Sequence, residues 1–253
     1  MREARVIVTV LLDDGGLYKT HKFAEPRYIG DPVNAIKIFN DKYIDEMCIL
    51  DISATREGRA PDWDILKHMA AQAFFPLSYG GGLTSIDDVQ TLFSIGFEKA
   101  VFTSALLDNE ELVKGAVKKF GQSAITGYVN VKKKLFGGHR VFDYRTGKVL
   151  PTSLDTFLPF AEGLGVGEII VNSVDRDGTL EGYDWPLVDA LGDDLSTPIV
   201  MSGGAAGLAD FKKVLAAQTV DSCAGGACFV FYGPLNAVLL NYPDLETLEA
   251  DLE

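Results

Sequence analysis

The sequence predicts an α/β fold of the (βα)8 TIM barrel type, in which eight parallel strands close into a ring inside a layer of helices. Short apolar runs alternate with helical segments along the chain, and the pattern repeats after about half of its length. The length of 253 residues is usual for this fold. Because no Pro/Gly/Ser-rich linker interrupts the chain, we expect one domain over residues 1–253.

The repeating unit is clearest in residues 76–106, PLSYGGGLTSIDDVQTLFSIGFEKAVFTSAL. A short apolar run ends in a glycine turn, and Ser85 and Asp88 have the spacing of a capping box ahead of a helical segment. A second apolar run then ends at Thr103-Ser104. This order of strand, turn, helix and strand is a βαβ unit of a parallel sheet.

Two offsets of 122 residues mark a second copy of this unit. Gly203-Gly204 follows Gly81-Gly82 by 122 positions, and Glu168 follows Glu46 by the same number. Each of these glutamates lies directly before an apolar run. Two copies of a four-strand unit predict a barrel built from two half-barrel repeats.

The barrel strands are expected at Val6–Leu12, Met47–Ile52, the run from Pro76 to the glycine turn, Ala100–Phe102, Ala124–Val131, Ile169–Ser173, Ile199–Ser202 and Val220–Gly225. Helices are expected after Asp31-Pro32, over 62–73, after Ser85, after Asp108, near Ser153 and Trp185, over 208–217, and after Gly233-Pro234 as one or two closing helices. Residues 13–30 are predicted to be a mobile cover over one mouth of the barrel, or else a structured excursion without a role. Residues 132–151 are predicted to form a β-hairpin inserted after strand five.

The composition excludes several classes of function. A formal net charge of −13 argues against a nucleic-acid partner, because phosphate binding needs a basic surface. Without a signal-peptide pattern or an apolar stretch of roughly 18 residues, we expect a soluble, cytoplasmic protein with no membrane partner. No metal or cofactor is expected, and three cysteines without metal-ligand spacing predict reduced core thiols: Cys48, Cys223 and Cys228.

Glycines and hydroxyl groups follow four of the strands and predict two phosphate cradles. One combines Gly80-Gly81-Gly82 with Thr103-Ser104, and the other combines Gly203-Gly204 with Gly225-Gly226-Ala227. Backbone N–H groups beside a helix start can hold a dianion, so two facing cradles would suit a ligand with a phosphate at each end. Glycines at strand ends also occur because a turn needs them, and this alternative stays open.

Charged residues lie directly before four strands, at the opposite end of the barrel: Arg5, Glu46, Lys99 and Glu168. Such residues are ordinarily solvated. Two cations and two anions at one axial level can instead converge into a ring that closes the barrel. Burial would then demand pairing, because an unpaired buried charge is very costly.

Acid/base chemistry needs ionisable groups at the mouth. The candidates are Asp13, Asp14, Asp51, Asp175 and Asp177, with Lys19 nearby. Asp175 and Asp177 lie in a DRDGT segment that also suits a turn. At the ends of strands one and five the residues are Leu11 and Asn130, and neither transfers a proton as a carboxylate does.

In these residues and their order the chain resembles the cyclase subunit of imidazole glycerol phosphate synthase, the HisF-type barrel of histidine biosynthesis. The likeness covers essentially the whole chain and is carried by RVIVTVLLDDGGLYK, GDPVNA, IDEMCILDISA, YGGG, the segment from Lys99 to Ala105, GEIIVNSVDRDGTLEGYD and SGGA. Within that family, LLDDGGLYKT, FAEPRYIGDPVNA and ATREGR look most like HisF-like paralogues of surface-glycan gene clusters, described as glycosyl amidation-associated proteins.

The resemblance implies a role for each group of residues. Ammonia from a HisH-type glutaminase partner would cross a gate made by the four charged residues and reach the strand-end site. A phosphorylated ligand would bind there at Gly82, Thr103, Ser104, Asp177, Gly178, Gly204, Gly226 and Ala227. Lys19 and Asp51 would belong to the catalytic site, in which Leu11 and Asn130 replace the two aspartates of the cyclase.

Three functional hypotheses follow. The first is an ammonia-channelling synthase subunit of a glutamine-dependent amidotransferase system that converts an acetamido to an acetamidino group on a sugar, together with a sugar amidotransferase. The second is the cyclase itself, with Asp13, Asp14 or Asp51 in place of the missing carboxylates. The third is a non-catalytic scaffold that binds a phosphorylated ligand and regulates a glutaminase.

Overall fold

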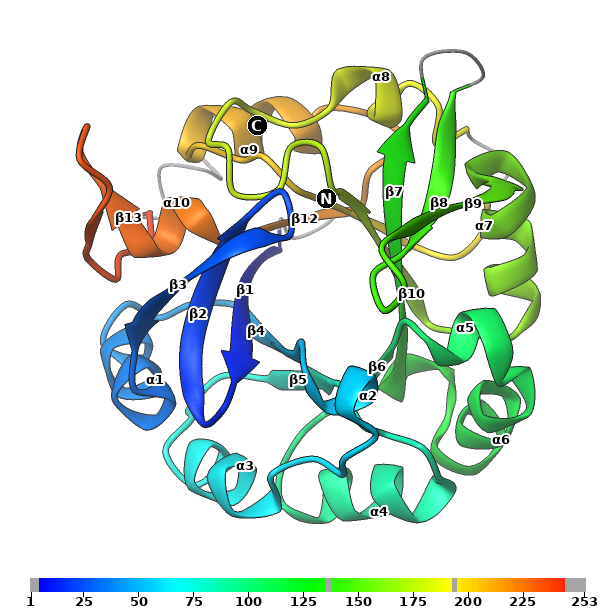
Figure 1. The fold of residues 1–253 in the computed structure, drawn as a ribbon, viewed down its shortest axis with the longest axis horizontal. Helices are drawn as coiled ribbons and strands as arrows, with labels where there is room; N and C mark the ends of the chain where they lie inside the picture. The colour runs from blue at the N-terminus through cyan, green and yellow to red at the C-terminus, as the bar shows by residue number, and fades with distance from the viewer. Residues whose placement is uncertain (1–4, 135–137, 193–194, 244–253) are drawn as a thin grey trace.

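Eight parallel strands form a closed barrel in the computed structural model, which describes residues 5–134, 138–192 and 195–243 (Figure 1). The strands are β1 (Val6–Asp13), β4 (Glu46–Asp51), β5 (Leu77–Gly80), β6 (Lys99–Phe102), β7 (Ile125–Lys133), β10 (Glu168–Ser173), β11 (Ile199–Ser202) and β12 (Ser222–Gly225). Each strand pairs in parallel with the next, and β12 pairs with β1, so the ring has no open edge. The predicted barrel is confirmed.

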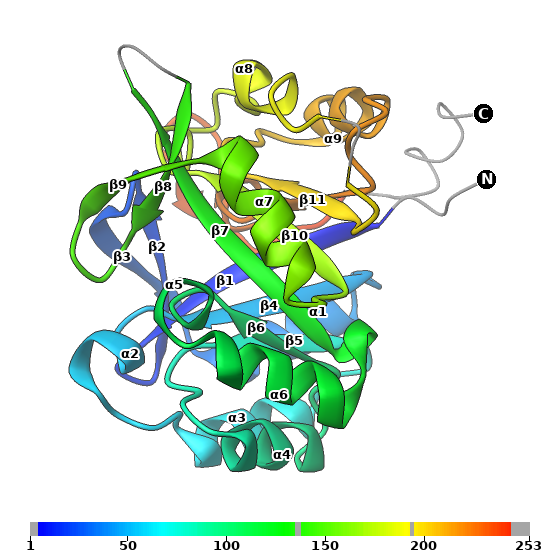
Figure 2. The same ribbon diagram turned by 90° about the vertical axis from the view of Figure 1, so that its right-hand side faces the viewer.

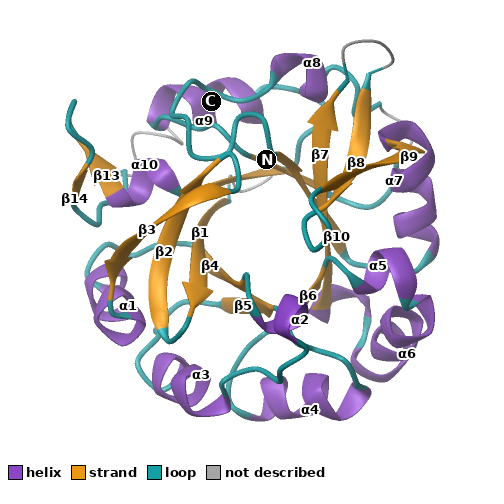
Figure 3. Ribbon diagram, in the orientation of Figure 1, coloured by secondary structure: helices purple, strands orange, loops and turns teal. Residues whose placement is uncertain are grey.

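Helices surround the strands on the outside of the ring (Figure 3). The longer ones are α1 (Pro32–Asn40), α3 (Trp63–Ala70), α4 (Ile86–Ser94), α6 (Glu110–Phe120), α7 (Leu154–Gly163) and α9 (Leu208–Leu215). Short helices follow strands at the site end: α2 (Ala54–Glu57), α5 (Ala105–Asp108), α8 (Trp185–Val188) and α10 (Ala227–Val230). The repeat is visible here, because α5 and α10 begin 122 residues apart, directly after β6 and β12.

Short-range sequence signals set the helix starts. At α4 the Asp88 N–H donates to Ser85 Oγ at 3.1 Å, and the Ser85 N–H donates to the Asp88 carboxylate at 2.8 Å, which is the predicted capping box. At α1 the Asp31 carboxylate accepts from the Asn34 N–H at 2.7 Å, and Pro32 occupies the first turn, where no N–H is needed.

Side chains of the barrel strands alternate between two cores. On β1, Val6 and Val8 point outward into the large apolar cluster under the helices, whereas Ile7 points into the barrel. The same alternation puts Cys48 of β4 inside the barrel and Cys223 of β12 outside it. Both thiols are buried and free.

Residues 16–30, in the segment predicted to cover the mouth, form a β-hairpin that extends the sheet from β1. β2 (Gly16–His21) pairs antiparallel with the end of β1, and β3 (Ala24–Gly30) pairs with β2. The register leaves a two-residue turn at Asp14-Gly15 with φ of 42° and 73°, the backbone geometry of a type I′ turn. An Asp-Gly pair after an apolar run is a hairpin signal, and the prediction overlooked it.

After β7 the chain continues in antiparallel strands. β8 (His139–Asp143) pairs with the end of β7, and β9 (Lys148–Ser153) pairs with β8. Residues 135–137, within the segment where the inserted hairpin was predicted, lie outside the described residues. Figure 2 shows β2, β3, β8 and β9 at the same end of the barrel.

The expected closing helices do not directly follow Gly233-Pro234. Instead, β13 (Phe231–Tyr232) and β14 (Ala237–Val238) form a two-stranded antiparallel pair, with Gly233 at φ +72° in the turn. Residues 244–253 lie outside the described part of the chain. Among the helices of the described residues, none combines the length and apolar character needed to cross a membrane.

Candidate functional site

A cavity of 510 Å³ opens at the carboxyl ends of the barrel strands. The twelve residues to which the family resemblance gives a ligand-binding or catalytic role all line it: Leu11, Lys19, Asp51, Gly82, Thr103, Ser104, Asn130, Asp177, Gly178, Gly204, Gly226 and Ala227. The strand ends of a parallel barrel share one face, so residues far apart in the sequence meet there.

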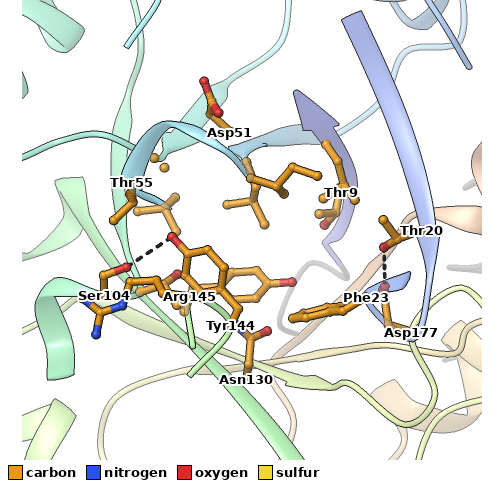
Figure 4. Close-up of a pocket in the computed structure, with 18 of the residues that line it drawn as sticks. Thr9, Thr20, Phe23, Asp51, Thr55, Ser104, Asn130, Tyr144, Arg145 and Asp177 are labelled. Atoms are coloured by element: carbon orange, nitrogen blue, oxygen red, sulfur yellow. Dashed lines mark hydrogen bonds between the residues drawn. The ribbon is translucent and has the colours of Figure 1, made fainter. Parts of the chain in front are cut away.

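Two hydrogen-bonded groups lie on opposite sides of this cavity (Figure 4). On one side the Tyr144 hydroxyl, from the turn between β8 and β9, lies 3.2 Å from Ser104 Oγ. On the other side Thr20 Oγ1 donates to the Asp177 carboxylate at 3.3 Å. Asn130 lies between the two groups in this view.

The β2–β3 hairpin reaches across to the loop that follows β10. The Lys22 N–H donates to the Asp177 carbonyl at 2.8 Å. A Cβ at Gly178 would lie 2.1 Å from the Thr20 carbonyl oxygen, so only glycine permits this approach. The hairpin therefore forms one wall of the site and brings Lys19, Thr20 and Phe23 into the cavity lining.

Lys19 is a buried cation in that wall. Its Nζ lies 3.6 Å from Asp177 Oδ1, and its side chain is 4% exposed. A Cβ at Gly226 would lie 2.5 Å from the same Nζ, so the glycine leaves room for the ammonium group. The cradle after β12 thus combines a cation with the first N–H groups of α10, which have no acceptor within the helix.

The cradle after β5 and β6 already has neutral partners. The Gly82 N–H donates to Thr55 Oγ1 at 3.0 Å, and Ser104 is bonded to Tyr144 as described. An anion bound here would exchange these hydroxyl partners for charged oxygens, which are stronger acceptors.

Leu11 and Asn130 give the mouth an apolar group and an amide. The Asn172 side-chain amide donates to Asn130 Oδ1 at 3.1 Å, and both residues are buried. With its oxygen engaged, Asn130 can offer its NH2 group to a ligand as a hydrogen-bond donor. Neither residue supplies a general acid or base.

At the opposite end of the barrel the four charged residues meet in one ring. Lys99 Nζ donates to Glu46 at 2.8 Å and to Glu168 at 3.0 Å. Arg5 donates to Glu46 at 3.1 Å and also to Glu168. Both carboxylates contact both cations, so charges of opposite sign alternate around the ring. We call this group the charged ring.

The cations of the charged ring favour the ionised form of Glu168. Burial alone would raise the pKa of Glu168, but the ion pairs with Lys99 and Arg5 outweigh it and lower the pKa below its ordinary value. Thr126 Oγ1 adds a hydrogen bond to Glu168 at 2.9 Å. The side chains of Glu46 and Glu168 are only 4% and 8% exposed, whereas Lys99 is 16% and Arg5 is 31% exposed, so the ring buries its carboxylates and leaves Arg5 partly open to solvent.

A family model described as histidine biosynthesis protein matches residues 5–233. The chain belongs to this family. It is 39% identical to hisF2 of Pseudomonas aeruginosa, over 98% of this chain and 99% of that protein. It is 38% identical to a HisF of Leptospira interrogans over 99% of each chain. Both names assign these relatives provisionally as imidazole glycerol phosphate synthase subunits. The imidazole glycerol phosphate synthase subunit HisF of Lactiplantibacillus plantarum is 35% identical over 91% of this chain and 92% of its own.

In this HisF-type barrel, Asp51 has its oxygens occupied. Oδ1 accepts from the backbone N–H groups of Ser53 and Ala54 at 3.1 and 2.9 Å. Arg59 donates to Oδ1 at 3.0 Å and to Oδ2 at 3.1 Å. A carboxylate held by this many donors orders the loop at α2 and is poorly placed to move a proton.

The other carboxylate candidates of this HisF-type barrel are spread out. Asp13 lines the cavity, whereas Asp14 is exposed in the type I′ turn. Asp175 accepts from the Lys133 N–H at 2.8 Å and holds the end of β7. Asp177 is paired with Lys19 and Thr20. The structure therefore brings Asp13, Asp51 and Asp177 to the cavity and leaves Asp14 and Asp175 outside its lining.

Sequence reasoning missed several residues of this HisF-type site. Tyr144 and Arg145 enter the lining from the turn between β8 and β9, and Phe23 enters from the tip of the β2–β3 hairpin. Arg145 is held by Asp143 at 3.0 Å and by Asp108. The Thr146-Gly147 pair predicted a turn within residues 132–151, but it did not predict that this turn lines the mouth of the barrel. Among the described residues, no cluster of three or more His, Cys, Asp or Glu side chains is arranged to hold a metal ion.

Proposed function

We propose that this HisF-type barrel is the synthase subunit of a glutamine-dependent amidotransferase system and conducts ammonia from a glutaminase partner to the strand-end cavity. One contrast within the barrel carries the proposal. The charged ring is complete and fully paired, whereas Leu11 and Asn130 stand at the two strand ends where the family resemblance implies catalytic aspartates.

The mouth lacks a proton-transfer group at both strand ends where the resemblance to the cyclase implies one. A positioned general acid or base typically contributes on the order of 10²–10⁴ in rate, and two such groups are absent at Leu11 and Asn130. Asp51 does not compensate, because its oxygens already accept from Arg59 and from backbone N–H groups. Ammonia that reaches this cavity therefore needs chemistry from another protein.

The end of the barrel that carries the charged ring offers a surface for a glutaminase. Tyr43 and Phe74 lie before β4 and β5 and are 88% and 90% exposed. The Phe74 N–H donates to Asn40 Oδ1 at 3.0 Å, which ties the two loops together. Large exposed aromatic side chains are typical anchors of protein interfaces. Docking there would place the partner's ammonia next to the charged ring.

The composition of the cavity supports a sugar as the acceptor. Its charged lining residues are three cations and four carboxylates, and two of the cations, Lys19 and Arg145, are paired with aspartates. Hydroxyl groups dominate the remaining polar lining: Thr9, Thr20, Thr55, Thr84, Thr103, Ser104, Tyr128, Tyr144 and Ser202. We propose an acetamido sugar that a separate sugar amidotransferase converts to the acetamidino form, with any phosphate group of the ligand held in the two cradles.

The test uses the chain with its glutaminase and sugar amidotransferase and measures transfer of ¹⁵N from amide-labelled glutamine to the sugar. Lys99→Met should reduce the glutamine-dependent rate while leaving the rate with added ammonium unchanged. Ligand-stimulated glutaminase activity without ¹⁵N transfer would support the scaffold hypothesis instead.

A second measurement addresses the cyclase hypothesis. The purified chain should show no turnover of the imidazole-precursor bisphosphate with ammonia, and it should not complement a histidine-requiring strain lacking HisF. Cyclase turnover comparable to that of a HisF with both aspartates would overturn the proposal.

A further inference from the structure

One apolar layer fills the inside of the barrel between the charged ring and the mouth. Seven buried residues, each from a different strand, form this layer: Ile7, Cys48, Val101, Tyr128, Ile170, Val200 and Ala224. None of them is more than 4% exposed. We call this set the inner layer, and Tyr128 is its one aromatic member.

The position of Tyr128 follows from the alternation of side chains on β7. Thr126, Tyr128 and Asn130 all point into the barrel, at successive levels about 6.6 Å apart. Thr126 donates to Glu168 of the charged ring at 2.9 Å, and Asn130 lines the mouth cavity. Tyr128 therefore lies between the charged ring and the mouth on a single strand.

The mouth cavity ends at two residues of the inner layer, and Tyr128 has the larger side chain of the two. Tyr128 and Val101 belong to its lining, whereas the other members of the inner layer do not. Tyr128 is thus at the floor of the cavity together with Val101, and the five other members of the layer are buried and outside the cavity lining.

We propose that Tyr128 is an inner closure of the barrel, which must move before a molecule can pass between the charged ring and the mouth. The inference rests on the proposed conduction of ammonia, because a closure at this level matters only if something crosses. Neutral ammonia can enter an apolar layer, whereas ammonium would lose its hydration without compensation. The charged ring and Tyr128 then act as two barriers in series.

The phenol itself remains uncharged in this position. Burial raises the pKa of Tyr128 well above its ordinary value. A neutral aromatic ring keeps the layer apolar, and its hydroxyl is hydrogen-bonded to Ser202 of the mouth lining.

Cys48 provides a built-in reporter of this closure. It lies in the inner layer, and burial raises the pKa of its thiol to about 12, so the thiol reacts slowly. Cys223 is equally buried but belongs to the outer core, so it is a matched control within the same molecule.

The experiment treats the full chain with methyl methanethiosulfonate and follows modification of each cysteine by peptide mass spectrometry. Tyr128→Ala should raise the ratio of the Cys48 rate to the Cys223 rate at least about tenfold, because the probe can then enter from the mouth. Tyr128→Phe should leave the ratio at the wild-type value, because the ring alone closes the layer. Tyr128→Leu gives the same test with an apolar side chain that does not reach as far, in case the alanine variant does not fold.

An unchanged ratio in the shortened variants would overturn the proposal, and so would an equal increase for Tyr128→Phe. The labelling needs neither glutaminase nor ammonia. A failure of ¹⁵N transfer with the expected labelling would therefore count against the proposed function alone, and the reverse result would count against the closure alone.

Discussion

The two ends of the barrel differ in how completely their buried polar groups are paired. At the charged ring each carboxylate has two cationic partners, and Glu168 also accepts from Thr126. At the mouth end, Thr9 Oγ1 and Asn172 Oδ1 are buried without a hydrogen-bond partner among the described residues. Native proteins leave few such atoms unsatisfied, and ligand sites are where they tend to occur. The comparison teaches that one end pairs its charged groups with one another, whereas the other leaves buried polar atoms without a protein partner among the described residues.

The charged ring should give the largest effect on stability. Glu168→Gln leaves Lys99 and Arg5 with one carboxylate between them, and breaking a buried ion pair lowers the free energy of unfolding by about 3–5 kcal/mol. Urea unfolding at neutral pH measures this loss.

The control for that measurement is Glu110→Gln. Glu110 forms an exposed pair with Lys114 four residues later on α6, and such pairs contribute about 0.3–0.5 kcal/mol. A loss below about 1 kcal/mol in the free energy of unfolding for Glu168→Gln would mean that the charged ring stabilises the fold no more than an exposed ion pair does.

Gly178→Ala should give the next effect, at the mouth. Its φ is +74°, and the new Cβ would meet the Thr20 carbonyl at 2.1 Å, so we expect a loss of about 2–3 kcal/mol. Faster hydrogen exchange of the Lys22 N–H should accompany it, because that group bonds to the Asp177 carbonyl. Gly58→Ala is the matched control, since its φ is +64° and no atom lies within 4 Å of the new Cβ. Equal losses in the two variants would show that the hairpin contact adds nothing.

Two variants of Asn130 separate the effect of its hydrogen bond from the effect of a charge on the free energy of unfolding. Asn130→Leu removes the acceptor of the Asn172 amide and should lower the free energy of unfolding by about 1–3 kcal/mol. Asn130→Asp keeps an acceptor for that amide and should stay within about 1 kcal/mol of the wild type. Thermal unfolding of the two variants checks the difference. If the aspartate variant were the less stable one, the Asn172 amide would not be oriented as a donor.

The smallest effect is a pH dependence of the charged ring. The pKa of Glu168 is lowered in the folded protein, so its ion pairs stabilise the fold fully above the unfolded-state pKa of about 4.3. That contribution is lost as the pH falls through the lower, folded-state pKa. The stability gap between wild type and Glu168→Gln should therefore be constant from about pH 7 to about pH 5 and shrink below about pH 4. A gap that widens in acid would contradict the assignment.

Some of this architecture was predictable from local patterns. Two features depend on sequence spacing alone. The structure confirms the capping box of Ser85 and Asp88, and it places Glu46 and Glu168, 122 residues apart, at the starts of β4 and β10. The glycines and hydroxyl groups that follow β5, β6, β11 and β12 were predictable because every parallel strand delivers its last residues to the same face. The family resemblance, and not the spacing, supplied the roles of Lys19, Asp177 and Gly178. The antiparallel pairing of β1 with β2 was missed although the Asp14-Gly15 turn between them is a local signal.

Other features had no signal in the sequence. Tyr144 reaches Ser104 from 40 residues away, and the hairpin tip meets the loop after β10 through the backbone of Lys22 and Asp177. In the sequence pattern, Tyr128 cannot be distinguished from any other apolar residue of a strand. Its place at the cavity floor depends on the side chains of six other strands.

The sequence by itself determined the eight strands, the starts of the longer helices and which chemical groups stand at each strand end, including an amide and an apolar residue where the family resemblance implies carboxylates. Interactions over two to four residues fix these properties. Only the tertiary structure decided that Lys99 meets Glu168 across 69 residues, that Asn172 holds Asn130, and that an aromatic ring separates the two ends of the barrel. Closure of the barrel brings these groups together, because residues at the same level of different strands become neighbours only when the ring is complete.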